Sequence, residues 1–62
     1  MRATGVECAV GDWVNFPKGD GIVIAEVKHR KCHHVDEYAS DWMLYTDRGT
    51  VWEASVLEVR KP

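Results

Sequence analysis

Short runs of alternating apolar and polar residues, separated by turn-forming residues, cover most of this 62-residue chain. The first run, residues 13–16, has the two-residue period of a strand. Val14 and Phe16 share one face of it, which we expect to point into a core, and Trp13 falls on the outer face. One proline and two glycines follow within 17–21 and predict a loop.

The next run, residues 22–28, is rich in β-branched residues and predicts a second strand. Its odd positions are all apolar, so we expect them in the core. These positions are Val23, Ala25 and Val27. The even positions begin with Ile22 and Ile24 and end with Glu26 and Lys28, so half of the outer face of this strand is apolar.

Residues 30–40 are polar and show no helical period over two turns, which predicts a long loop. The runs 42–46 and 50–54 predict two further strands. Between them, Asp47-Arg48-Gly49 predicts a three-residue hairpin loop with glycine in the left-handed conformation.

A three-residue loop sets Thr46 opposite Thr50 and thereby determines which side chains of the hairpin share a face. One of the two faces contains no charge, and we interpret it as the core face. The predicted core face consists of Trp42, Leu44, Trp52 and Ala54. The predicted outer face consists of Met43, Tyr45, Val51 and Glu53.

Residues 55–58 are too few for an α-helix and predict one 3₁₀ turn that Ser55 caps. Residues 59–61 predict a brief fifth strand. The predicted fold is therefore all-β, a five-stranded small barrel over residues 10–62 with a 3₁₀ turn before the last strand. Residues 1–9 show no period and are predicted to be a flexible lead-in.

This order of features resembles the SH3-like and Tudor-like small barrels. The shared features are a Gly-Asp-x-Val opening, a glycine loop, a bent second strand, an Asp-x-Gly hairpin and a closing Ala-Ser-x-Leu-Glu turn, over residues 10–59. The resemblance implies a five-stranded SH3-like barrel. It implies no particular activity, because this fold hosts many unrelated functions.

The opening Val10–Pro17, with Gly19 and the run Gly21–Ile24, is similar to the start of the CarD-type RNA-polymerase-interacting domain. This resemblance implies docking on a polymerase β subunit through a strand surface, and hence a role in transcription regulation. It does not extend to the helical DNA-binding part of CarD proteins, so only the docking function is implied.

Gly11-Asp12 and the stretch Ala54–Glu58 are similar to the plasmid-borne type II dihydrofolate reductases, small barrels that assemble as homotetramers around a shared pore. Where that family has an active-site Val-Gln-Ile-Tyr strand, this chain has Gly49-Thr50-Val51-Trp52. The resemblance therefore implies a homo-oligomeric barrel that binds a small ligand, without reductase activity.

Eight Lys and Arg residues against ten Asp and Glu residues give a net charge of −2. A dedicated nucleic-acid-binding domain is usually basic, so this balance disfavours that class. Cys8 and Cys32 do not make a disulfide framework, and no apolar run is long enough to span a membrane. We therefore expect a soluble, cytoplasmic protein.

The apolar outer surface leads to the main functional hypothesis, a non-enzymatic adaptor that binds a protein partner or a second copy of itself. Its predicted contact residues are Trp13, Ile22, Ile24, Met43, Tyr45 and Val51. The sequence contains no recognisable catalytic constellation, and we expect neither catalysis nor a cofactor.

A nucleic-acid-binding barrel is the alternative, because basic residues cluster within residues 28–34. Its predicted contacts are Lys28, Arg30, Lys31 and His34, with Trp13 or Tyr38 as a stacking ring. Cys32, His33 and His34 are competent metal ligands. However, adjacent side chains of an extended segment point apart, so we expect no metal site there.

Overall fold

Five antiparallel strands and one 3₁₀ helix form the fold in the computed structural model, which describes residues 7–62. The elements are β1 (Trp13–Lys18), β2 (Gly21–His34), β3 (Ser40–Thr46), β4 (Gly49–Trp52), η1 (Glu53–Ser55) and β5 (Glu58–Arg60). The all-β class and the 3₁₀ turn before the last strand are thereby confirmed. The strands form one sheet in the order β4-β3-β2-β1-β5, and among the described residues no pairing of β4 with β5 closes it into a barrel.

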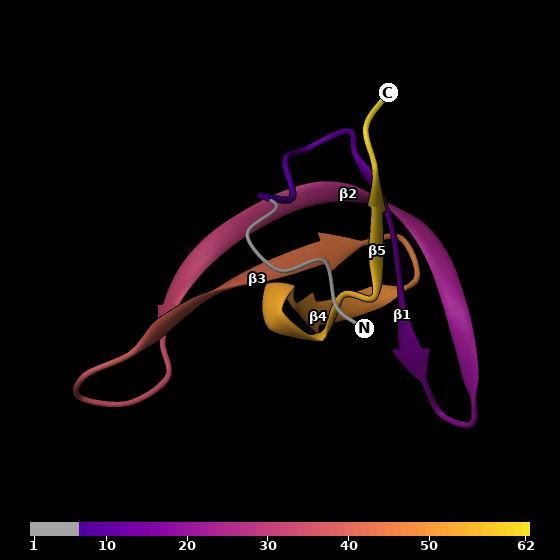
Figure 1. Cartoon of the computed structure of the whole chain (residues 1–62). Coiled ribbons are helices and arrows are strands. Elements are labelled where there is room, and N and C mark those ends of the chain that lie inside the picture. The colour runs from indigo at the N-terminus through magenta and orange to yellow at the C-terminus, as the bar shows by residue number, and fades with distance from the viewer. Residues whose placement is uncertain (1–6) are drawn as a thin grey trace.

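Strand β2 is the longest element and belongs to both halves of the sheet, which Figure 1 shows as one long arc. Its first part, from Gly21 to Glu26, pairs with β1, and its second part, up to His34, pairs with β3. The register shifts between Val27 and His29, which marks a β-bulge. A bulge adds one residue, bends the strand and reverses which side chains point inward. The two halves of the sheet therefore curve over one core.

The segment 30–40, which the sequence predicts as a long loop, is mostly strand. Strand β2 continues to His34 and β3 begins at Ser40, so only residues 35–39 connect them. The prediction of a loop is wrong because a polar segment can also form a strand when its side chains face solvent. Here the backbone hydrogen bonds with β3 hold residues 30–34 extended.

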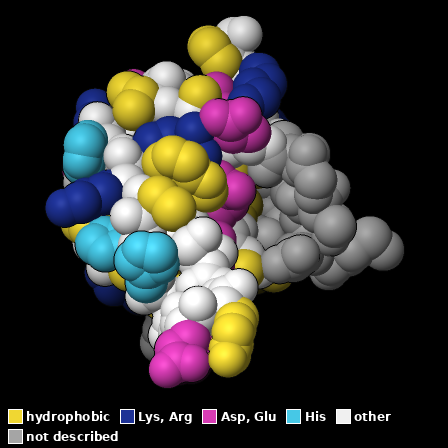
Figure 2. All heavy atoms as spheres, turned by 90° about the vertical axis from the view of Figure 1, so that its left-hand side faces the viewer, with side chains coloured by type: hydrophobic (Ala, Val, Ile, Leu, Met, Phe, Trp, Pro, Cys, Tyr) yellow, Lys and Arg dark blue, Asp and Glu magenta, His cyan; other side chains and the backbone are white. Residues whose placement is uncertain are grey.

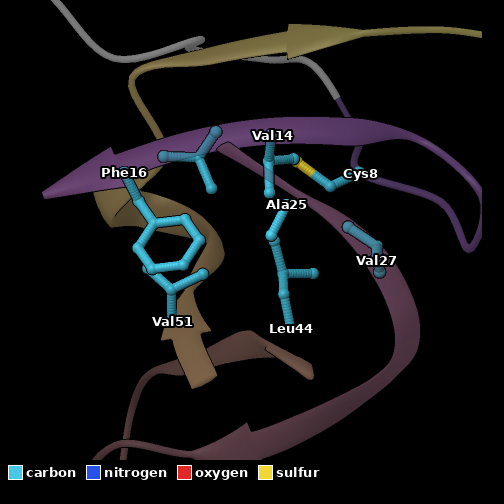
Figure 3. Close-up of a cluster of buried hydrophobic side chains, with 8 residues drawn as sticks. Cys8, Val14, Phe16, Ala25, Val27, Leu44 and Val51 are labelled. Carbon is cyan, nitrogen blue, oxygen red and sulfur yellow. The ribbon is translucent and has the colours of Figure 1, made fainter. Parts of the chain in front are cut away.

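Eight hydrophobic side chains of the described residues are buried in one cluster between the two halves of the sheet (Figure 3). They are Cys8, Val14, Phe16, Ala25, Val27, Leu44, Val51 and Val56. The predicted inward faces of β1 and of the first part of β2 are confirmed. Cys8 is in the core although it precedes residue 10, at which the predicted barrel begins. Residues 1–6 of the predicted lead-in lie outside the described residues.

The β3–β4 hairpin has a two-residue loop, Asp47-Arg48, in place of the predicted three-residue loop, because Thr46 pairs with Gly49. The Thr46 hydroxyl donates to the Gly49 carbonyl oxygen at 2.7 Å and accepts a hydrogen bond from the Arg48 N–H at 3.0 Å. Gly49 has a φ of 123°, a conformation that favours glycine. The predicted hairpin register is therefore wrong by one residue.

A slip of one residue moves every β4 side chain to the other face of the sheet. Val51 pairs with Leu44 and is buried, so the prediction that it lies on the outer face is wrong. Trp52 pairs with Met43 on the outer side and is half-buried. Trp42 is 37% exposed and is not a core residue. Of the predicted core face of this hairpin, only Leu44 is in the core.

The 3₁₀ helix η1 begins two residues earlier than predicted, because β4 starts one residue earlier than predicted and is one residue shorter. Trp52 occupies the N-cap position and makes no side-chain cap bond, so Ser55 is not the cap. The backbone N–H of Val56 donates to the Glu53 carbonyl oxygen at 3.2 Å, and the Val56 side chain is buried. The turn thereby closes one end of the core.

We expect the two cysteines to react with a thiol reagent at very different rates. Burial, with the Glu53 carboxylate as the next cause, raises the pKa of Cys8 to about 11. Cys32 is exposed. Since the thiolate is the reactive form, native protein should titrate one thiol quickly and the second only in denaturant. The Cys32→Ser variant should show no fast thiol, and a fast reaction of that variant would contradict the burial of Cys8.

Candidate functional site

Three large apolar side chains are exposed together on the side of β1 and β2 that faces away from the core. Trp13 is 47% exposed, Ile22 64% and Ile24 61%. In the register of the two strands, Pro17 lies opposite Ile22 and Asn15 opposite Ile24, so all five side chains share one face. We call these five residues the outer apolar face. The predicted outward positions of Trp13, Ile22 and Ile24 are confirmed.

A shallow groove of about 420 Å³ crosses this face from β2 to β5. Its lining residues are Trp13, Asn15, Ile24, Glu58, Arg60 and Lys61. Asn15 lies on the middle strand, between Ile24 on β2 and Glu58 on β5. The Asn15 Oδ1 atom is buried and accepts no hydrogen bond from the described residues. The groove thus has apolar walls, an amide on its middle strand and a charged rim.

Opposite charges flank Trp13 on its two neighbouring strands. Glu26 on β2 and Arg60 on β5 both lie directly opposite Trp13 in the register. Each forms an ion pair along its own strand, Glu26 with Lys28 at 3.2 Å and Arg60 with Glu58 at 3.3 Å. These pairs are solvent-accessible and contribute little to stability, so both charges remain available to a partner.

The sequence pattern alone does not identify the groove residues at β5, which are Glu58, Arg60 and Lys61. Their position depends on the pairing of β5 with β1, for example Val59 with Val14, which are far apart in the chain. The alternation of Glu58, Val59 and Arg60 does predict that the two charged side chains share one face. It does not predict which strand lies beside them.

A buried carboxylate anchors this rim. Asp12 is 2% exposed and accepts hydrogen bonds from the Ala9 N–H at 2.8 Å and from the Lys61 ammonium group. Lys61 also donates to the Glu7 carbonyl oxygen. The hydrogen bond from Lys61, together with that from Ala9, holds the pKa of Asp12 below its usual value although burial opposes this. The segment before β1 is thereby tied to the end of β5.

Met43 and Tyr45, which the sequence predicts in the same patch, point outward from β3 on the other half of the sheet and are half-buried. The Tyr45 ring lies 5.5 Å from that of His29, and its hydroxyl lies 3.1 Å from His33 Nε2. His33 also packs edge-on against Trp52 at 6.0 Å. The β2 bulge separates this aromatic cluster from the outer apolar face, so the predicted patch is divided in two.

Arg30, a predicted phosphate contact, already interacts with acidic and aromatic side chains of the protein. Its guanidinium group pairs with Glu7 and with Glu53, and it lies 3.8 Å from the centre of the Trp42 ring. The Arg30 side chain is only 15% exposed. Figure 2 shows one face of the molecule, on which hydrophobic, basic, acidic and histidine side chains adjoin one another. The charge of Arg30 is therefore largely neutralised by the protein itself.

The other basic residues of β2 do not share one face with Arg30. Lys28 lies at the bulge and pairs with Glu26, whereas Lys31 and His34 are exposed. Neighbouring side chains of a strand point to opposite faces, so Lys31 points away from the side of Arg30 and His34. The basic residues of this segment therefore lie on both faces of the strand and do not form one basic patch.

Cys32, His33 and His34 lie at the end of β2, where strand geometry sends successive side chains to alternate faces. Within residues 7–62, no three His, Cys, Asp or Glu side chains are grouped so that they could hold a metal ion.

Comparisons with protein-family models, with curated proteins and with solved structures find no match to this chain. In residues 7–62, no helix has the length and apolar character needed to cross a membrane.

Proposed function

We propose that this chain is a non-enzymatic protein-interaction module, an adaptor that binds a protein partner through the outer apolar face. The observation that carries the proposal is the joint exposure of Trp13, Ile22 and Ile24 on adjacent strands. Contiguous exposed apolar side chains on a small protein are typical of a binding surface. Tryptophan is also enriched among the residues that contribute most to protein–protein affinity.

The surroundings of this face have the composition of an interface rim. Glu26, Glu58, Arg60 and Lys61 border the apolar residues, and charged residues at the edge of an interface select partners and orient them. Because Glu58 and Arg60 of the groove pair with each other and no Ser, Thr, Cys or His side chain lines it, the face supports binding better than catalysis.

The proposal includes an SH3-like architecture. Three features support it: the strand order β4-β3-β2-β1-β5, the bent β2 shared by the two halves of the sheet, and the 3₁₀ turn between β4 and β5. In an SH3-like barrel the outer strand faces are free for partners, which agrees with the use of the outer apolar face. The fold alone names no partner.

The test is photo-cross-linking in the cells that express the chain. A photoreactive phenylalanine derivative at the position of Ile24 should give ultraviolet-dependent adducts with protein. Adding Trp13→Ala should lower their yield about tenfold, because a central tryptophan contributes strongly to affinity. The matched control is the same derivative at Tyr38, which is 94% exposed at the tip of the β2–β3 hairpin.

Adducts from the Ile24 position and none from the Tyr38 position would support the proposal. Equal adducts from both positions, or none from Ile24, would contradict it. The identity of the adduct then tests the role in transcription, since a polymerase subunit is the partner that the CarD resemblance implies.

A further inference from the structure

We propose that the outer apolar face binds a second copy of this chain, face to face, about a two-fold axis parallel to β1. This inference rests on the proposed function and names the partner. A two-fold interface requires that one surface be complementary to itself, and the charge pattern around Trp13 meets this requirement.

The row of side chains across the sheet at Trp13 has this self-complementarity. Glu26 lies on one side of Trp13 and Arg60 on the other, both directly opposite it in the register. Rotation about an axis parallel to β1 keeps each residue at its height along the strand and exchanges the two sides. Glu26 of one copy therefore lies opposite Arg60 of the partner subunit, and the same pair forms a second time.

The residues on the middle strand face their own counterparts across the same axis. Trp13 packs against Trp13 of the partner subunit, with ring stacking as its additional contribution. One row further along β1, the Asn15 amide faces the amide of the partner subunit. In this row the same rotation sets Ile24 of each copy opposite Glu58 of the partner subunit, whose carboxylate lies beside Arg60. The Asn15 Oδ1 atom is buried and accepts no hydrogen bond from the described residues, so this amide has an unused acceptor.

The size of the chain favours a partner subunit. A 62-residue domain buries a smaller share of its surface than larger domains do, and small scaffolds gain stability from association. Here the buried hydrophobic cluster excludes Trp13, Ile22 and Ile24, all of which are available on one face. Two sheets that pack face to face align their strands within about 30° of each other, which agrees with an axis parallel to β1.

Charge reversal tests this geometry. In sedimentation equilibrium we expect the wild-type chain to show a mass of twice 7.1 kDa at high concentration. The single variants Glu26→Arg and Arg60→Glu each set like charges opposite each other at two places, so each should dimerise at least about tenfold more weakly. Thermal unfolding of both variants checks that they are folded.

The two single variants should recover association when they are mixed. In that heterodimer both facing pairs again join an arginine to a glutamate. One pair is the new arginine at position 26 with the new glutamate at position 60, and the other is the native Glu26 with the native Arg60. The double variant Glu26→Arg/Arg60→Glu should also self-associate, for the same reason. Trp13→Ala should leave every one of these proteins monomeric, because it removes the central contact.

Three results of the sedimentation experiments would overturn the inference. The first is a wild-type chain that stays monomeric at millimolar concentration, and the second is single variants that dimerise as the wild type does. The third is a mixture of folded single variants that remains monomeric. Cross-links from the Ile24 position to other proteins alone would also overturn it while leaving the proposed function intact, so the two failures are distinguishable.

Discussion

The Phe16→Ala variant is expected to be largely unfolded at room temperature in the absence of denaturant. Phe16 is 2% exposed and lies in the core beside Val51, between the two halves of the sheet (Figure 3). Replacing a buried phenylalanine by alanine costs about 3–5 kcal/mol. A single core of this size supplies only about 3–5 kcal/mol in total, so the loss matches the whole stability of the domain. Urea unfolding followed by circular dichroism measures it.

The matched control is Trp13→Ala, which removes a larger ring from the opposite, outward face of the same strand. Trp13 is 47% exposed, and surface substitutions usually change the free energy of unfolding by less than about 0.5 kcal/mol. The two variants are compared at a protein concentration at which the chain is monomeric. If Phe16→Ala unfolded at the same urea concentration as Trp13→Ala, the inward and outward faces of β1 would be assigned incorrectly.

Acid is expected to destabilise the fold through Asp12. The hydrogen bond from Lys61 lowers the pKa of this carboxyl group in the folded state, whereas in the unfolded chain it is near the ordinary value of about 3.9. The unfolded state therefore binds the proton first. The stabilisation is fully present well above about pH 4 and is lost as the pH falls through the lowered folded-state pKa. Unfolding curves at a series of pH values between neutral and acid measure this loss.

Two substitutions separate the parts of this site. Asp12→Asn retains a carbonyl acceptor for the Ala9 N–H and loses the charge that pairs with Lys61, so its stability should fall less steeply with acid than that of the wild type. Asp12→Ala also removes the acceptor of the Ala9 N–H, which adds a cost of about 0.5–1.5 kcal/mol.

Asp20→Asn, in the exposed turn between β1 and β2, is the control and should keep the wild-type pH dependence. An Asp12→Asn variant with the wild-type pH profile would show that another group controls acid stability. A profile altered by Asp20→Asn as well would point to a general charge effect in place of the pair with Lys61.

Local sequence patterns correctly predicted which side chains of β1 and the first part of β2 point inward, because this depends only on alternation along each strand. The alternation at Val14 and Phe16 and the apolar odd positions of β2 identified both inward faces, because a strand with one buried face requires a two-residue period. The outward positions of Trp13, Ile22 and Ile24 follow from the same period. These three residues are the large apolar side chains of the candidate site.

The same patterns failed where pairing between strands decides the outcome. The bulge between Val27 and His29 reverses the inward side of β2, and no local signal in this polar stretch marks it. The Thr46 hydroxyl closes a two-residue loop, which shifts β4 by one residue and buries Val51. A one-residue slip leaves the sequence pattern almost unchanged but exchanges the two faces of a strand.

The sequence by itself determined the all-β class, the number of strands and the residues that begin the outer apolar face, since these depend on short-range periodicity and turn chemistry. Only the tertiary structure decided that β5 lies beside β1, which sets Glu26 and Arg60 on either side of Trp13. It also decided that Arg30 is neutralised by Glu7 and Glu53. These contacts join residues far apart in the chain. Which strands pair depends on how the whole core is buried, and local sequence patterns contain no information about that.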